Sequence, residues 1–165
     1  EEHLASATVR TIVEIVYPGV LKAKAEVAPA GRTVLLACPP EEAHDLGLRM
    51  VADRFDMAGW TTYFLGPDTP VEEIAAAARR LEADAVVMSS STHFHRVAVR
   101  HAVDALKREL PDTDVWVGGP AFAGAATGWL PQEIVDLDAL LDAPAPAGPG
   151  EGADRGGDAA SAGEG

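Results

Sequence analysis

Sulfur and aromatic side chains are scarce in this chain of 165 residues. There is one cysteine, Cys38, and aromatic residues make up 5% of the sequence. A single cysteine excludes an internal disulfide framework and is typical of a protein kept in a reducing cytoplasm. The core must therefore come from the aliphatic residues that dominate the 47% hydrophobic fraction. That composition favours a compact α/β domain.

Positive charge is also in short supply. Lysine and arginine total 13 against 26 aspartates and glutamates, which gives a formal net charge of -13. This balance argues against direct binding to nucleic acid or to an anionic membrane, because phosphate groups need basic partners. No apolar run approaches the roughly 20 residues of a membrane span, and no signal peptide is recognisable. The first residue is a glutamate inside a helical pattern, so we expect the chain to be part of a longer or processed protein.

The N-terminal segment has helical periodicity. Apolar residues recur with helical spacing from Leu4 to about Val16, and Pro18-Gly19 is expected to end the helix. One apolar face of this helix must be buried against another element. We interpret residues 1–24 as the last helix of a preceding helical bundle, followed by a linker over residues 24–32.

The rest of the chain alternates strands with helices, which predicts an α/β domain over residues 31–143. We expect a flavodoxin-like (Rossmann-like) doubly wound parallel sheet of order 2-1-3-4-5, with Asp68 or Thr69 capping the third helix. Residues 144–165, rich in Pro, Gly, Ala and acids, are expected to form a disordered acidic tail. The expected strands cover residues 33–38, 60–65, 85–90 and 114–119, the helices cover 46–59, 71–83 and 97–110, and a short helix with room for a fifth strand follows.

One histidine stands out at the predicted ligand edge of this sheet. In parallel α/β sheets ligands bind at the carboxyl ends of the strands, and His44 follows the first strand. Alone, such a histidine is more often a surface or helix-capping residue. Here Glu42 can accept the proton of one ring nitrogen and leave the other for a metal. Gly47 removes a side chain where a bulky group could approach.

Three short motifs fall at the carboxyl ends of the first, third and fourth strands. They resemble the signature of cobalamin-binding domains of the methionine synthase and methylmalonyl-CoA mutase type, which is Asp-x-His-x-x-Gly, Ser-x-Leu and Gly-Gly. The resemblance covers about residues 32–143. In this chain the motifs read Glu42-x-His44-x-x-Gly47, Ser89-Ser90-Ser91 without the leucine, and Gly118-Gly119.

This resemblance implies a bound cobalamin whose benzimidazole has left cobalt. His44 would take the vacated lower position as the metal ligand, with Glu42 hydrogen-bonded behind it. Imidazole suits such a borderline metal better than carboxylate does. The remaining residues implied in cofactor binding are Asp45, Leu46 and Gly47 beside the ligand, Ser89, Ser91 and Thr92 along the nucleotide tail, and Gly118 and Gly119 at its ribose and phosphate.

A narrower resemblance is to light-sensing, cobalamin-dependent transcriptional regulators. In that family a helical bundle covers the upper face of the corrin, and a Glu-His pair in its last helix lies near the upper ligand. Glu2-His3 matches this pair. The resemblance implies a cytoplasmic sensory module that binds adenosylcobalamin, or alternatively methylcobalamin, and signals by self-association or through a fused or partner domain. The family's DNA-binding head is not recognisable in this sequence.

Other functions stay open at this point. The main alternative is a corrinoid methyl-carrier protein or the cobalamin-binding subunit of a methyltransferase or mutase. A domain that binds another tetrapyrrole such as a bilin, or a flavodoxin-like module without a corrin, are further alternatives. We see no set of catalytic base and nucleophile, so we do not expect an enzyme. His93 and His95 are interpreted as polar loop residues near the edge of the corrin.

Overall fold

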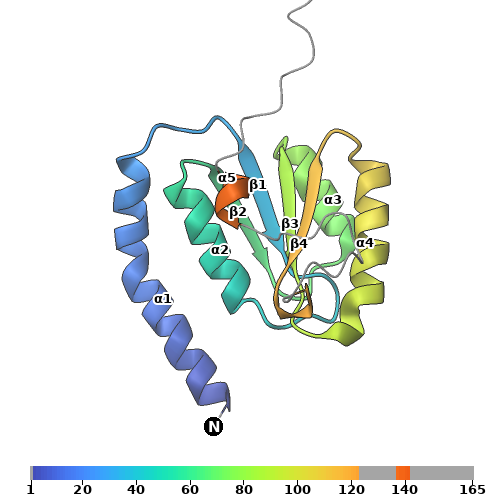
Figure 1. The fold of residues 1–165 in the computed structure, drawn as a ribbon, viewed down its shortest axis with the longest axis horizontal. Coiled ribbons are helices and arrows are strands. Elements are labelled where there is room, and N and C mark those ends of the chain that lie inside the picture. The colour runs from blue at the N-terminus through green and yellow to red at the C-terminus, as the bar shows by residue number, and fades with distance from the viewer. Residues whose placement is uncertain (1, 123–136, 142–165) are drawn as a thin grey trace, which may run out of the picture.

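The computed structural model describes residues 2–122 and 137–141, and within these ranges the side chains from residue 7 onward except that of residue 139. Its centre is a four-stranded, fully parallel sheet of order β2-β1-β3-β4 (Figure 1). This confirms the predicted doubly wound architecture for these four strands. The predicted room for a fifth strand, and the tail over residues 144–165, lie outside the described residues. The strands are β1 (Thr33–Ala37), β2 (Thr61–Gly66), β3 (Ala85–Ser89) and β4 (Asp114–Gly118).

Helices cover both faces of the sheet, as Figure 1 shows. On one face α2 packs over a cluster that contains Phe55 and Trp60, whose rings meet edge to face at 5.1 Å. On the other face the apolar stripes of α3 and α4 pack on Leu35 and Val86. No helix among the described residues is long and apolar enough to cross a membrane. The helices are α1 (Glu2–Ala25), α2 (Leu46–Met57), α3 (Val71–Arg80), α4 (Arg96–Glu109) and α5 (Leu137–Leu141), with short 3-10 turns η1 (His93–His95) and η2 (Pro120–Phe122).

Helix α1 differs from its prediction in length. It runs through Pro18 to Ala25, so the expected end at Pro18-Gly19 is wrong. Proline removes one backbone donor and disfavours the helical bond to the carbonyl four residues earlier. Pro18 lies on the exposed side of the helix, where water can take that carbonyl, and this explains why the helix continues.

The buried side of α1 also differs from the predicted apolar face. The helix packs against α2, outside the layer that covers the sheet (Figure 1). Val13 and Tyr17 on the packed side are half-buried. Ile12 and Val16, which the periodicity placed on a buried face, remain 54% and 56% exposed. Two ion pairs, Arg10 with Asp45 and Lys24 with Asp56, join the two helices in addition to this apolar packing.

The predicted caps of α3 serve another purpose. The N-cap position is Pro70, and no side chain caps the helix. The Thr69 hydroxyl donates instead to the Gly66 carbonyl oxygen at 3.3 Å. The Asp68 carboxylate accepts the Glu41 backbone N–H at 2.8 Å. The Thr69 backbone N–H also donates to the Cys38 carbonyl oxygen at 3.0 Å. Asp68 and this backbone bond therefore tie the loop after β2 to the loop after β1, which carries His44.

Candidate functional site

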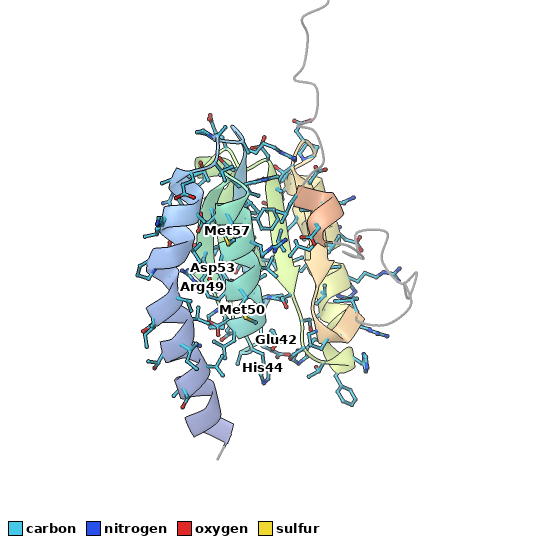
Figure 2. All side chains as sticks on the ribbon, turned by 60° about the vertical axis from the view of Figure 1, so that its left-hand side comes forward. Glu42, His44, Arg49, Met50, Asp53 and Met57 are labelled. Carbon is cyan, nitrogen blue, oxygen red and sulfur yellow. The ribbon has the colours of Figure 1, made fainter. Side chains whose placement is uncertain are left out.

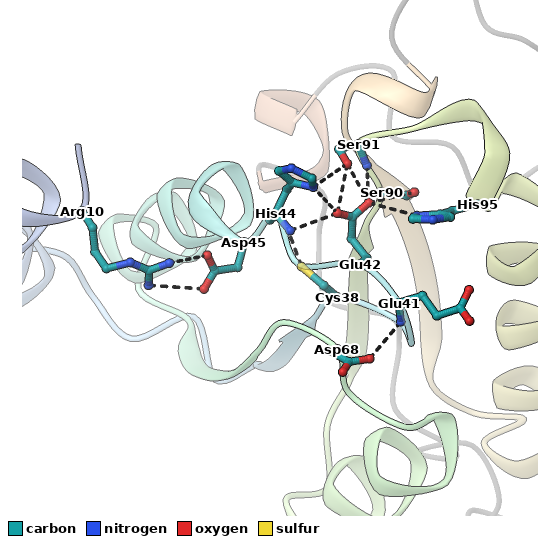
Figure 3. Close-up of polar contacts among 10 residues, drawn as sticks. All are labelled: Arg10, Cys38, Glu41, Glu42, His44, Asp45, Asp68, Ser90, Ser91 and His95. Carbon is teal, nitrogen blue, oxygen red and sulfur yellow. Dashed lines mark hydrogen bonds and ion pairs between the residues drawn. The ribbon is translucent and has the colours of Figure 1, made fainter. Parts of the chain in front are cut away.

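The Glu42 carboxylate is the centre of the predicted site. It lies in the loop after β1, and its side chain is completely buried. Oε1 accepts the His44 backbone N–H at 3.0 Å, and Oε2 accepts the Ser91 backbone N–H at 2.6 Å. The Ser91 hydroxyl donates to the same carboxylate at 2.8 Å, and the Ser90 hydroxyl does so at 3.3 Å (Figure 3). One carboxylate thus joins the loops that follow β1 and β3.

These hydrogen bonds keep Glu42 charged. Burial by itself raises the pKa of a carboxyl group because it disfavours the charged form. The backbone and side-chain bonds from Ser91 and His44 outweigh that effect and lower the pKa of Glu42 to about 2. A negative charge therefore stays behind His44 at any physiological pH.

The His44 ring points outward from this buried carboxylate. Its side chain is 74% exposed, yet Nδ1 lies 2.7 Å from Glu42 Oε1. A carboxylate can only accept, so Nδ1 of the neutral ring carries the proton and Nε2 keeps its lone pair. Figure 2 shows both residues at one end of the molecule, below the first turn of α2. The arrangement can present a single oriented nitrogen ligand to a metal outside the protein surface.

A metal at this position would need its other ligands from elsewhere. Within the part of the chain that the structure describes, no three histidine, cysteine, aspartate or glutamate residues gather in a metal-binding group. Cys38 lies close by, with its thiol 3.7 Å from the His44 carbonyl oxygen. Burial raises the pKa of Cys38 to about 12, so it remains a thiol. The donor set therefore fits a metal that a macrocycle already holds and that takes one further nitrogen.

The loop after β4 packs closely against the loop after β3. Gly119 has a φ of +99°, which favours glycine. A Cβ atom there would lie 2.5 Å from the Ser90 carbonyl oxygen and 2.6 Å from the Ser89 hydroxyl. Next to these residues the Thr92 hydroxyl oxygen is buried and has no hydrogen-bond partner among the described residues. A buried hydroxyl without a protein partner fits a polar ligand group in the loop after β3.

The structure brings some of the predicted cofactor residues together and leaves others apart. Gly118 ends β4, and its carbonyl accepts the Ser90 N–H at 3.1 Å. The Asp45 carboxylate is directed away from His44 and pairs with Arg10 of α1. Gly47 is exposed, with open space where a side chain would stand. The backbone of Glu2 and His3 forms the first turn of α1, and their side chains lie outside the described part of the structure.

The residues predicted to bind the cofactor did not include Ser90 or Arg10, and His95 was expected only near the edge of the corrin. Ser90 is buried and reaches Glu42, although the motif drew attention to its neighbours. His95 Nδ1 lies 3.5 Å from Glu42 Oε2, so this histidine belongs to the rim of the site. Arg10 reaches the site loop from 35 residues away. The serine motif of residues 89–91 and the histidines at positions 93 and 95 were sequence signals for Ser90 and His95, and no local signal pointed to Arg10.

A family comparison decides the assignment. The model of the B12 binding domain matches residues 32–139. The chain belongs to the B12 binding domain family. Its cofactor class is therefore cobalamin, as the motifs around His44 predicted.

Two curated relatives of this B12 binding domain are transcriptional repressors from Myxococcus xanthus. The HTH-type transcriptional repressor CarA is 36% identical over 88 residues, which cover 53% of this chain and 29% of CarA. The HTH-type transcriptional repressor CarH is 36% identical over 128 residues, which cover 73% of this chain and 39% of CarH. The chain thus matches less than two fifths of the length of either repressor.

Solved structures show the same fold at lower identity. A cobalamin-binding protein from Desulfitobacterium hafniense DCB-2 superposes with a TM-score of 0.58 at 21% identity, over 68% of this chain and 56% of that one. The monomethylamine corrinoid protein of Methanosarcina barkeri gives 0.62 at 18%, over 78% and 61%. The methanol:cobalamin methyltransferase complex MtaBC from the same organism gives 0.57 at 20%, over 69% and 47%.

Proposed function

We propose that this chain is the cobalamin-binding module of a sensory regulator, and that His44 coordinates cobalt in place of the cofactor's own benzimidazole. The observation that carries this proposal is the geometry of His44. Its ring is 74% exposed but fixed through Nδ1 by a fully buried carboxylate. A histidine with only a solvation role would not be held by a partner of this kind. Metal-ligating histidines commonly donate the N–H that does not bind the metal to a carboxylate, and Nδ1 of His44 faces Glu42 in this way.

The other residues around His44 divide between holding the ring and receiving the nucleotide tail. Glu42 holds the ring through its contact with Nδ1, and Ser91 holds the Glu42 carboxylate in turn. We assign the Thr92 hydroxyl, which has no partner among the described residues, and the Ser89 hydroxyl at the end of β3 to polar groups of the tail. Gly119 keeps the loop after β4 in close contact with Ser89 and Ser90, because a side chain there would displace them.

The sensory role is supported by α1 and by the kind of relatives found. Figure 1 shows α1 extending past the carboxyl edge of the sheet, so Glu2 and His3 begin a turn that projects beyond the His44 loop. We assign these two residues to the upper side of the cofactor. When bound, adenosylcobalamin supplies a cobalt–carbon bond that light can break. The similarity to CarA and CarH supports a regulator rather than an enzyme.

The output of the module is also part of the proposal. We assign residues 1–24 to a helical cap and residues 31–143 to the cofactor domain. A change at the cofactor would then alter contacts between copies of the chain or with a signalling domain. The scarcity of cysteine supports a cytoplasmic site of action.

The test is a dark titration with adenosylcobalamin, followed by absorption spectra before and after green light. We expect the wild-type absorption spectrum to show histidine bound to cobalt and to change on illumination. The elution volume in size-exclusion chromatography should change on illumination as well. His44→Ala should weaken binding by about tenfold or more, in line with the loss of one metal–ligand bond. His101→Ala, which removes an exposed histidine on α4, is the matched control and should bind like wild type.

Two results would contradict this function. An unchanged cobalt spectrum in His44→Ala would show that His44 is not the cobalt ligand. Binding without any light response, combined with methyl transfer from methylcobalamin to a thiol acceptor, would establish the carrier function found in corrinoid proteins instead.

A further inference from the structure

Asp45 occupies a capping position but does not cap. It precedes α2, where an aspartate ordinarily accepts a backbone N–H of the first helical turn. Here φ is -100° and ψ is -11°, and its side chain makes no such bond. The Asp45 side chain is only 5% exposed, so its charge needs a partner. That partner comes from another helix.

Arg10 of α1 is the partner. Its Nη2 donates to Asp45 Oδ1 at 2.7 Å, and its Nη1 lies 3.4 Å from Oδ2 (Figure 3). Such a two-point contact fixes the plane of a carboxylate as well as its position. Because Asp45 follows His44 directly in the chain, holding its side chain also limits the movement of the histidine's backbone.

A second contact supports the same end of α2. The Arg49 backbone N–H donates to the Asp45 carbonyl oxygen at 2.8 Å. The Arg49 guanidinium lies 4.7 Å from the ring centroid of Tyr17 in α1. Two guanidinium groups therefore join α1 to the first turn of α2. Arg10 of α1 binds the Asp45 side chain. Arg49 of α2, whose backbone bonds the Asp45 carbonyl, lies over Tyr17 of α1.

A comparable ion pair joins the two helices far from the site. Lys24 Nζ lies 2.6 Å from Asp56 Oδ1, and the Asp56 side chain is only 9% exposed. Asp56 is in the last turn of α2, about 16 Å along the axis from Asp45. Both pairs join a partly exposed cation of α1 to a nearly buried acid of α2. Only the Arg10 pair adjoins the His44 loop.

We propose that Arg10 is a positioning residue for cobalamin: by holding the Asp45 carboxylate away from the free N–H groups of α2, it keeps the His44 loop in its binding conformation. This rests on the proposed function. Without Arg10, the Asp45 carboxylate turns to those N–H groups, and His44 shifts relative to Glu42. Coupling between two sites is reciprocal. Bound cobalamin therefore fastens α1 to the domain, and displacement of α1 loosens the cofactor.

The experiment compares Arg10→Ala with Lys24→Ala in dark titrations with adenosylcobalamin. Each variant loses one ion pair between α1 and α2, so both should lose similar thermal stability. Arg10→Ala should weaken cobalamin binding by about five- to tenfold, within the usual range of site coupling. Lys24→Ala should stay within about twofold of wild type, because its pair does not touch the loop. Arg10→Lys keeps the charge but not the two-point contact, and it should restore part of the affinity.

A double variant and hydrogen exchange test the route through Asp45. If Arg10 acts through Asp45, then Arg10→Ala combined with Asp45→Asn should bind no worse than Asp45→Asn alone. Cobalamin should slow amide exchange in α1 of wild type but not of Arg10→Ala.

The outcomes separate this proposal from the function it rests on. Equal affinities of Arg10→Ala and Lys24→Ala, with His44→Ala still impaired, would overturn the role of Arg10 alone. Failure of the wild-type chain to bind cobalamin would overturn both.

Discussion

The two edges of the sheet both bury charge, but they use it differently. At the amino edge the Arg32 guanidinium stacks 4.0 Å over the centroid of the Trp60 ring. There the Asp84 carboxylate accepts the Thr33 backbone N–H at 2.6 Å. At the carboxyl edge, Glu42 holds the exposed ring of His44.

The two edges differ in the kind of group that each charged side chain contacts. At the amino edge each charge contacts a ring or a backbone group that belongs to the fold. At the carboxyl edge a buried charge holds a group that faces solvent. A buried charge by itself is therefore weak support for a functional site, and the exposed group that it orients is the informative feature.

The largest contrast should come from turning one carboxylate at each edge into an amide. Glu42→Gln places an NH2 group against the donors of Ser91 and His44, and we expect a loss of about 3 kcal/mol in unfolding free energy. Asp84→Asn keeps an oxygen for the Thr33 N–H and should cost about 1 kcal/mol or less. Urea unfolding at pH 7 measures both. Equal losses would show that the edges do not differ.

The pH dependence sharpens the same contrast. Folding lowers the pKa of Glu42 to about 2 from an ordinary value of 4.5. Its stabilisation is therefore complete above pH 4.5 and is lost as pH falls towards 2. Wild-type stability should decline through this range more steeply than that of Glu42→Gln. Parallel pH profiles of the two proteins would contradict the role given to these hydrogen bonds.

Two glycines provide a contrast of intermediate size. Gly59 at the amino edge and Gly119 at the carboxyl edge have φ values of +83° and +99°. In both, an added Cβ would lie 2.5 Å from a backbone carbonyl oxygen. Each change to alanine should lower the free energy of unfolding by about 2 kcal/mol, which thermal unfolding measures. Only Gly119→Ala should also weaken cobalamin binding, because it displaces the loop of Ser89 and Ser90. Equal cobalamin affinity in the two variants would argue against a tail site at this turn.

The smallest effect is expected at Arg32. Arg32→Lys keeps the charge but cannot stack a planar group on Trp60, so we expect about 1 kcal/mol lower stability. Calorimetry measures this loss, and a cobalamin titration provides the control. A clear drop in the cobalamin affinity of Arg32→Lys would mean that packing at the amino edge affects the binding site.

Much of the fold could be predicted from local pattern. The four strands were found within a residue or so, because buried parallel strands are continuous apolar runs bounded by turns. The central pair of Glu42 and His44 was also predictable, since its two members are two positions apart in the chain and follow the first strand. Short-range spacing carries this kind of information.

Contacts between distant segments could not be predicted. Nothing local links Arg10 to Asp45, which was expected to face the cofactor and instead faces α1. The continuation of α1 through Pro18 depends on which side of the helix faces water. That side is set by packing against α2, which the periodicity of α1 alone does not reveal.

The orientation of the His44 ring has a consequence for how fast and how tightly a ligand is captured. A freely rotating imidazole would lose rotamer freedom on meeting a metal, and that entropy loss would oppose complex formation. Here folding has already immobilised the ring, so the encounter involves little further ordering of this side chain. The empty protein should therefore capture its macrocycle as a rigid receptor, with little rearrangement of this loop.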